Sequence, residues 1–105
     1  MKLILVVEPT AEEDMFIGYR WYEDRHVGLG AKFLEALEEL FDHILENPLL
    51  YVESIPCVRR SVTRTFPYLV FYAFERNTIH ILAVIHAAQD PDYIAERLGS
   101  SPPLG

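Results

Sequence analysis

The chain has 105 residues, half of them hydrophobic and 24% charged, with a formal net charge of −7. This length favours one domain, and the composition is globular rather than disordered. Nucleic-acid binding depends on Lys and Arg that neutralise phosphates, so the acidic balance favours a protein partner or a small molecule. The single cysteine, Cys57, excludes a disulfide framework within the chain and indicates a reducing compartment.

The chain begins with a short apolar run over residues 2–7, which Glu8-Pro9 ends. The run is too short for a signal peptide, so we interpret it as a strand, buried on both faces or paired at the centre of a sheet. No apolar run approaches the ~20 residues of a membrane span. We therefore expect a cytoplasmic protein that has no membrane partner.

Two helices are predicted next. Thr10 and Glu13 have the spacing of a capping box, which predicts a helix that starts at Ala11 and ends near His26. Its aromatic residues are expected in the core: Tyr19, Trp21 and Tyr22. A second, clearly amphipathic helix is predicted over residues 31–46, and a tight glycine turn would join the two as an antiparallel hairpin.

Three consecutive strands are predicted over residues 57–66, 68–75 and 78–86. The middle run is apolar throughout, which is typical of a central strand covered on both faces. Strict alternation in the last strand would place Ile79, Ile81, Ala83 and Ile85 on one face. Asp90-Pro91 then predicts a short last helix over residues 91–98.

The resulting order is β-α-α-β-β-β-α. It predicts an α+β fold with a largely antiparallel sheet and the helical hairpin packed on one face. We expect one domain over residues 1–99 and a flexible tail over residues 100–105, which are rich in Ser, Pro and Gly.

Several short motifs occur along this order of elements. They are Trp21-Tyr22-Glu23, Gly28-Leu29-Gly30 with Phe33 and Leu37-Glu38, Ile44 with Asn47-Pro48, Val58-Arg59-Arg60, Phe66-Pro67-Tyr68-Leu69-Val70-Phe71-Tyr72, Ile79 with Val84 and His86, and Asp90-Pro91. In this order and at these spacings, the chain resembles the RelE/ParE toxin superfamily, the plasmid-stabilisation proteins of bacterial type II toxin–antitoxin modules. The resemblance runs from about Glu8 to Arg97.

The resemblance implies a small toxin that a co-encoded antitoxin holds inactive. One branch of the superfamily cuts ribosome-bound messenger RNA, and another poisons DNA gyrase. Many relatives have an arginine immediately before the Asp-Pro pair, where this chain has Gln89, and the central strand carries no Arg or Lys. Cleavage of RNA needs cations and an acid–base pair around the scissile phosphate. These departures favour the ParE branch, which acts by binding rather than hydrolysis.

Candidate site residues follow for each alternative. A ribonuclease would use Arg60, Arg64 and His86. An antitoxin or target would contact Arg59, Arg60, Arg64 and Tyr93, with Arg60 the best single candidate, because guanidinium groups bind acidic tails and phosphates. The alternative for the arginines is a solvated outer strand. For His86, a structural hydrogen bond to the turn at Asp90 is the simpler interpretation.

No metal site and no cofactor are expected, because the histidines lack partners at ligand spacing. Three hypotheses therefore remain: a ParE-like toxin that acts on gyrase, a ribosome-dependent mRNA endonuclease, and a degenerate member that only binds an antitoxin or a second copy of itself. Exposed apolar surface left by an absent partner would also favour a homodimer.

Overall fold

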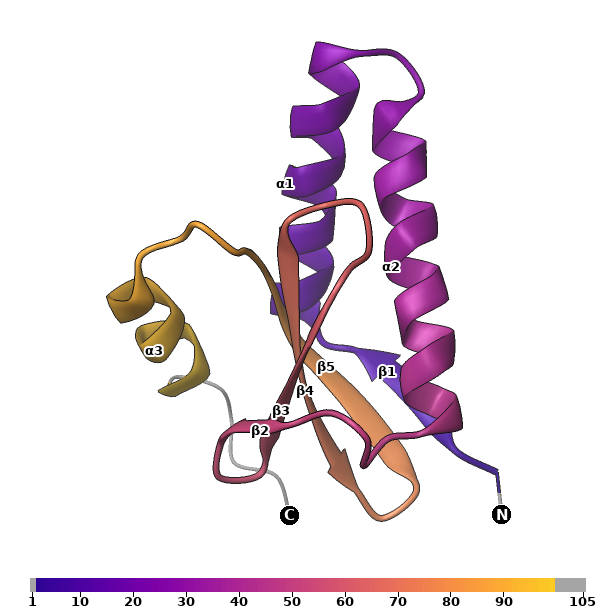
Figure 1. The fold of residues 1–105 in the computed structure, drawn as a ribbon, viewed down its shortest axis with the longest axis vertical. Coiled ribbons are helices and arrows are strands. Elements are labelled where there is room, and N and C mark those ends of the chain that lie inside the picture. The colour runs from indigo at the N-terminus through magenta and orange to yellow at the C-terminus, as the bar shows by residue number, and fades with distance from the viewer. Residues whose placement is uncertain (1, 100–105) are drawn as a thin grey trace.

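The computed structural model describes residues 2–99, and the predicted tail over residues 100–105 lies outside them. The elements in chain order are β1 (Ile4–Val7), α1 (Pro9–Arg25), α2 (Leu29–Glu46), β2 (Glu53–Ile55), β3 (Val58–Val62), β4 (Tyr68–Glu75), β5 (Thr78–His86) and α3 (Pro91–Gly99) (Figure 1). The predicted α+β class is confirmed, and the short strand β2 is an addition to it.

The five strands form one sheet in the order β1-β5-β4-β3-β2, and only the β1–β5 pair is parallel. The strand predicted within residues 2–7 is confirmed as β1, but its predicted central or doubly buried position was wrong, because β1 is an edge strand and its Ile4 and Val6 side chains are exposed. The alternate residues Leu3, Leu5 and Val7 pack on the core. Half of this strand is therefore apolar without being buried.

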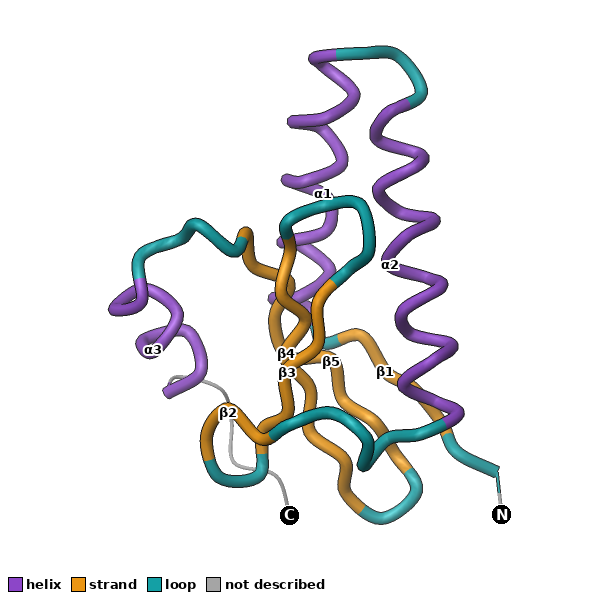
Figure 2. Tube along the Cα trace, viewed as in Figure 1, coloured by secondary structure: helices purple, strands orange, loops and turns teal. Residues whose placement is uncertain are grey.

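The sheet has an apolar core on each face, as the central strand predicts. On one face, the α1–α2 hairpin packs over residues that include Val70, Tyr72 and Ile81. On the other face, Leu98 of α3 packs with Phe71 and Ala73. The molecule therefore has three layers, in which the hairpin and α3 lie on opposite sides of the sheet and the far turns of the hairpin extend beyond it (Figures 1 and 2).

The start of α1 differs from the predicted capping box. The helix begins at Pro9, with Glu8 as the N-cap residue and no side-chain cap hydrogen bond. Proline fits the first helical position because its fixed φ suits the helix and its missing N–H needs no partner there. The Thr10 hydroxyl instead donates to the carbonyl of Leu82 in β5, at 3.4 Å.

A bulge in β5 overturns the predicted strict alternation. Phe71 pairs with Ala83 and the next residue, Tyr72, pairs with Ile81, which leaves Leu82 as the extra residue. Residues beyond the bulge change face, so that Val84 rather than Ala83 joins the core under the hairpin. The bulge also frees backbone groups of β5 for side chains of α1.

Candidate functional site

The arginines of β3 diverge because alternate residues of a strand point to opposite faces. Arg59 pairs with Tyr72, on the hairpin side, and Arg60 pairs with Phe71, on the α3 side. The Arg59 guanidinium donates to the carbonyl of Tyr51 at 2.6 Å and to that of Leu49 at 3.4 Å. Arg59 is therefore engaged in holding the loop that follows α2.

Arg60 lies at a cleft of about 360 Å³ between β2, β3 and α3. Its apolar lining comes from Ile55, Leu69, Phe71, Ile94, Leu98 and neighbouring small residues, and its polar side chains are those of Arg60, Ser54 and Gln89. We call this the Arg60 cleft. No bulge interrupts the pairing of β3 with β4 at Arg60, and Val62, two residues further on, is exposed and lines a groove along α2.

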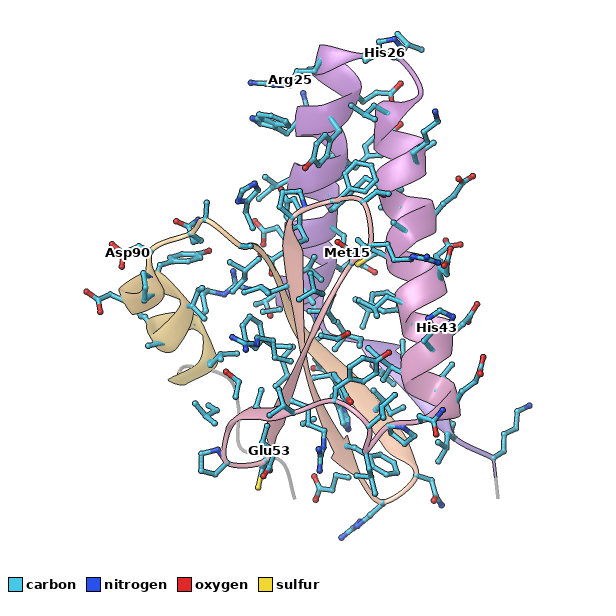
Figure 3. All side chains as sticks on the ribbon, viewed as in Figure 1. Met15, Arg25, His26, His43, Glu53 and Asp90 are labelled. Atoms are coloured by element: carbon cyan, nitrogen blue, oxygen red, sulfur yellow. The ribbon has the colours of Figure 1, made fainter. Side chains whose placement is uncertain are left out.

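Arg64 lies on the opposite side of the molecule from the Arg60 cleft. Its guanidinium is 3.7 Å from the carboxylate of Glu39 in α2, and both side chains are largely exposed, so the pair contributes little to stability. Arg64, Glu39 and His43 line a groove of about 350 Å³ along α2. In Figure 3, His43 on α2 and Asp90 before α3 lie on opposite sides of the sheet.

His86 and Tyr93 line a third cleft, of about 140 Å³, together with Asp14, Ile17, Tyr68 and Gln89. The Ala88 N–H donates to Nδ1 of His86 at 3.0 Å, so His86 stabilises the turn before Asp90. The His86 ring also packs edge-on against Tyr68, with centroids 5.2 Å apart. The Tyr93 hydroxyl accepts a hydrogen bond from Arg97 at 2.9 Å.

The structure does not bring the predicted site residues together. Arg60, Arg64 and His86 line three different clefts, of which the Arg60 cleft and the His86 cleft adjoin at Gln89. The strand pairing places the Cα atoms of Arg60 and His86 roughly 14 Å apart. Within residues 2–99, no group of three His, Cys, Asp or Glu side chains is arranged to hold a metal ion.

An apolar stripe lies on the outer side of α1, and it includes Trp21, which was predicted to lie in the core. Trp21 is 49% exposed, and Phe16 and Ile17 are more exposed still. Arg20 lies over the ring of Phe16 and Arg25 over that of Trp21, at 5.8 and 3.4 Å from the ring centroids. The prediction for Trp21 was wrong because α1 has apolar residues on two faces, and only the face with Ala11, Gly18 and Tyr22 is buried.

Two comparisons place the fold among solved toxin structures. A mutant of the E. coli toxin RelE in the free state matches with a TM-score of 0.67 and 16% identity, covering 96% of this chain and 95% of that one. A chromosomal ParDE toxin–antitoxin system from P. aeruginosa matches with a TM-score of 0.61 and 17% identity, covering 80% and 95%. At these identities the likeness shows the fold alone.

A third match is a mutant of E. coli RelE in complex with a peptide of its antitoxin RelB, with a TM-score of 0.61, 17% identity and coverage of 99% and 100%. A sequence search of curated proteins finds no significant match. None of the helices within residues 2–99 has the length and apolar content that crossing a bilayer requires. The sequence model of the family described as "ParE toxin of type II toxin-antitoxin system, parDE" matches residues 5–91, and the chain therefore belongs to the ParE toxin family.

Proposed function

We propose that this ParE-family toxin acts by binding a target protein, with DNA gyrase the first candidate, and that a co-encoded antitoxin neutralises it. The observation that carries the binding mode is the dispersal of the candidate catalytic residues over three clefts. Hydrolysis of RNA needs several charged groups around one phosphate. A binding surface instead needs a few well-placed anchors within an apolar patch.

The exposed stripe of α1 is the surface that we propose for the antitoxin. Phe16, Ile17 and Trp21 give it apolar area, and Arg20 and Arg25 flank the aromatic rings. An amphipathic helix with acidic residues beside its apolar face would complement this surface. The complex of E. coli RelE with a RelB peptide is a precedent for peptide recognition on the same fold.

The test of the target uses purified toxin and purified gyrase. We expect the toxin to inhibit DNA supercoiling, and the co-encoded antitoxin to restore it. Unchanged supercoiling at high molar excess would count against gyrase as the target. The same sample added to a translation extract distinguishes the endonuclease, because only an mRNA-cleaving toxin would give truncated transcripts.

The test of the antitoxin surface uses Trp21→Glu and Ile17→Asp. Both positions are exposed, so the fold should persist, whereas affinity for the antitoxin should fall by at least tenfold. Glu12→Gln, also exposed and on the same helix, is the matched control. Equal affinity of all three variants for the antitoxin would mean that the antitoxin binds another surface.

A further inference from the structure

The Arg60 cleft combines an apolar pocket with a cation that has no partner within residues 2–99. We propose that this cleft binds an extended segment of the target protein in which a carboxylate side chain adjoins a large apolar side chain. The inference rests on the proposed function, since it names the surface and the chemistry by which a binding toxin would hold its target.

The free guanidinium is unusual within this chain. Among the arginines of residues 2–99, the side chains of Arg60 and Arg76 alone make no hydrogen bond, ion pair or ring contact. Arg76 lies at the turn between β4 and β5, in a shallow polar hollow with Glu75, Thr78 and His80. Arg60 is therefore the one such arginine that stands beside apolar walls.

These surroundings favour a carboxylate as the group that Arg60 binds. A guanidinium offers two parallel N–H donors that match the two oxygens of a carboxylate. Apolar walls exclude water around such a pair, which strengthens the charge-assisted hydrogen bonds. Among the described residues that line the cleft, none has an acidic side chain that would compete for Arg60.

The walls of the cleft favour an apolar anchor next to that carboxylate. Ile55, Leu69 and Ile94 come from β2, β4 and α3, and Ile55 is 41% exposed. Burial of an aromatic or aliphatic side chain against them would remove this apolar area from water, which favours binding. Anchors of this kind, beside an arginine, dominate the affinity of protein interfaces.

A nucleic acid fits the same cleft poorly. Phosphate backbones are held by several cations, and Arg60 is the only Lys or Arg among the described residues that line this cleft. Gln89 is neutral, and the one aromatic ring in the lining, that of Phe71, is 1% exposed and so is not available to stack on a base. A protein segment therefore suits the cleft better than RNA does.

The position of the cleft favours the target over the antitoxin as the source of that segment. The Arg60 cleft lies on the α3 side of the sheet and approaches the α1 stripe at Gln89, which it shares with the His86 cleft that Ile17 lines. From Ile17 the stripe runs along α1 to Trp21 and Arg25, toward the far turns of the hairpin (Figure 3). A partner that lies along the stripe therefore leaves the Arg60 cleft open to a second partner.

The chemistry is tested by selecting a random-peptide display library on the immobilised wild-type protein. We expect enrichment of peptides in which Asp or Glu adjoins Leu, Ile, Phe or Trp. Enrichment should be lost on Arg60→Ala, reduced on Arg60→Lys, and retained on Arg76→Ala, which removes another exposed arginine away from the cleft. No enrichment, or enrichment that Arg60→Ala leaves unchanged, would overturn the proposal. Peptide selection that succeeds only after removal of residues 100–105 would assign the cleft to that segment. A wild-type dimer that Arg60→Ala dissociates would assign it to a second copy of the chain. Either result would also overturn the proposal.

A second experiment tests whether the bound segment comes from the target or from the antitoxin. It measures growth arrest on expression and, by calorimetry, affinity for the co-encoded antitoxin. We expect Arg60→Ala to reduce growth arrest at least tenfold while antitoxin affinity stays within threefold of wild type. Loss of antitoxin affinity instead would assign the cleft to the antitoxin and overturn the commitment to the target. If the wild-type protein causes no arrest, the proposed function fails, and the display result still decides whether the cleft binds acidic–apolar peptides.

Discussion

Asp14 of α1 and Arg97 of α3 form a bidentate ion pair, with nitrogen–oxygen distances of 2.9 and 2.7 Å, although 83 positions separate them in sequence. The Asp14 carboxylate also accepts a hydrogen bond from the Val84 N–H at 3.0 Å, just beyond the bulge of β5. The hydrogen bond to Asp14 raises the pKa of Arg97 above its ordinary value, which burial only partly opposes. One carboxylate therefore connects α1, the bulge and α3.

Replacement of Asp14 should detach α3 more than it harms the rest of the fold. The two side chains are 13% and 20% exposed, so Asp14→Ala leaves a poorly solvated guanidinium and an unpaired Val84 N–H. We expect a loss of about 2–4 kcal/mol in the free energy of unfolding, measured by denaturant titration. Hydrogen exchange should accelerate first in α3.

A double-mutant cycle isolates the ion pair. Asp14→Ala and Arg97→Ala should show a coupling energy of about 1–3 kcal/mol, whereas Glu39→Ala and Arg64→Ala, an exposed pair, should show less than ~1 kcal/mol. Equal coupling energies in the two cycles would mean that Asp14 holds α3 through an interaction other than its ion pair with Arg97.

The glycine at the start of α2 marks a close approach between the hairpin helices. A Cβ at Gly30 would lie 2.7 Å from the carbonyl oxygen of Tyr19 and 2.9 Å from the Glu23 carboxylate. The same carboxylate accepts hydrogen bonds from the N–H groups of Gly28 and Gly30, which satisfies the N-terminus of α2. Gly30→Ala should therefore cost about 1–3 kcal/mol, despite the better helix propensity of alanine.

Gly28→Ala is the contrasting variant. Its φ of +91° disfavours a side chain, but no atom lies within 4 Å of the added Cβ, so we expect only the local strain of about 1 kcal/mol. Thermal denaturation of both variants provides the measurement. A Gly30→Ala protein as stable as wild type would show that the hairpin can widen at little cost.

Features set by local periodicity were predictable from the sequence. The acidic and apolar faces of α2, the apolar run of β4 and the Asp90-Pro91 start of α3 each depend on a few neighbouring residues. The position of β1 was not predictable in this way, because its pairing with β5 depends on how the hairpin carries the chain across the sheet. The prediction that Trp21 is buried was wrong for a similar reason, because α1 has two apolar faces and the core covers the face with Ala11, Gly18 and Tyr22.

The candidate site shows the same limit. Its most informative residue, Arg60, was evident from the cluster of arginines in one strand. The separation of Arg59, Arg60 and Arg64 depends on strand register and on what covers each face, which only the folded chain reveals. The role of Asp14 carried no sequence signal, because its partners lie 70 and 83 positions away.

Neighbouring arginines of β3 should respond differently to truncation. Arg59→Ala removes the hydrogen bonds to Tyr51 and Leu49, and we expect a loss of about 1–2 kcal/mol in the free energy of unfolding. Arg60→Ala should change stability by less than ~0.5 kcal/mol, because its side chain has no partner within the described residues. Faster proteolysis of residues 47–52 in Arg59→Ala alone would locate the effect in the loop, and equal stability of the two variants would contradict it.

Tyr72 should make the protein sensitive to alkaline pH. Its side chain is fully buried, and its hydroxyl donates to the carbonyl of Pro48 at 2.6 Å. Burial raises its pKa to about 12, and the nearby Arg59 charge only partly opposes this shift. A folded-state pKa above the unfolded value of 10.0 means that the contribution is complete below pH 10 and is lost between pH 10 and 12.

We expect the free energy of unfolding to fall over that window by on the order of 2 kcal/mol from Tyr72. Burial also raises the pKa of Tyr22 and Tyr68, which adds to the fall in the same direction. Denaturant titrations from pH 8 to 11.5 provide the measurement.

Tyr72→Phe should be less stable than wild type at pH 8 by about 1 kcal/mol, because the Pro48 carbonyl loses its donor, and its stability should decline less steeply above pH 10. Tyr19→Phe is the matched control, because the Tyr19 hydroxyl makes no hydrogen bond within the described residues, and it should keep the wild-type slope. A Tyr72→Phe protein with the wild-type slope would show that Tyr72 ionises as readily in the fold as in the unfolded chain.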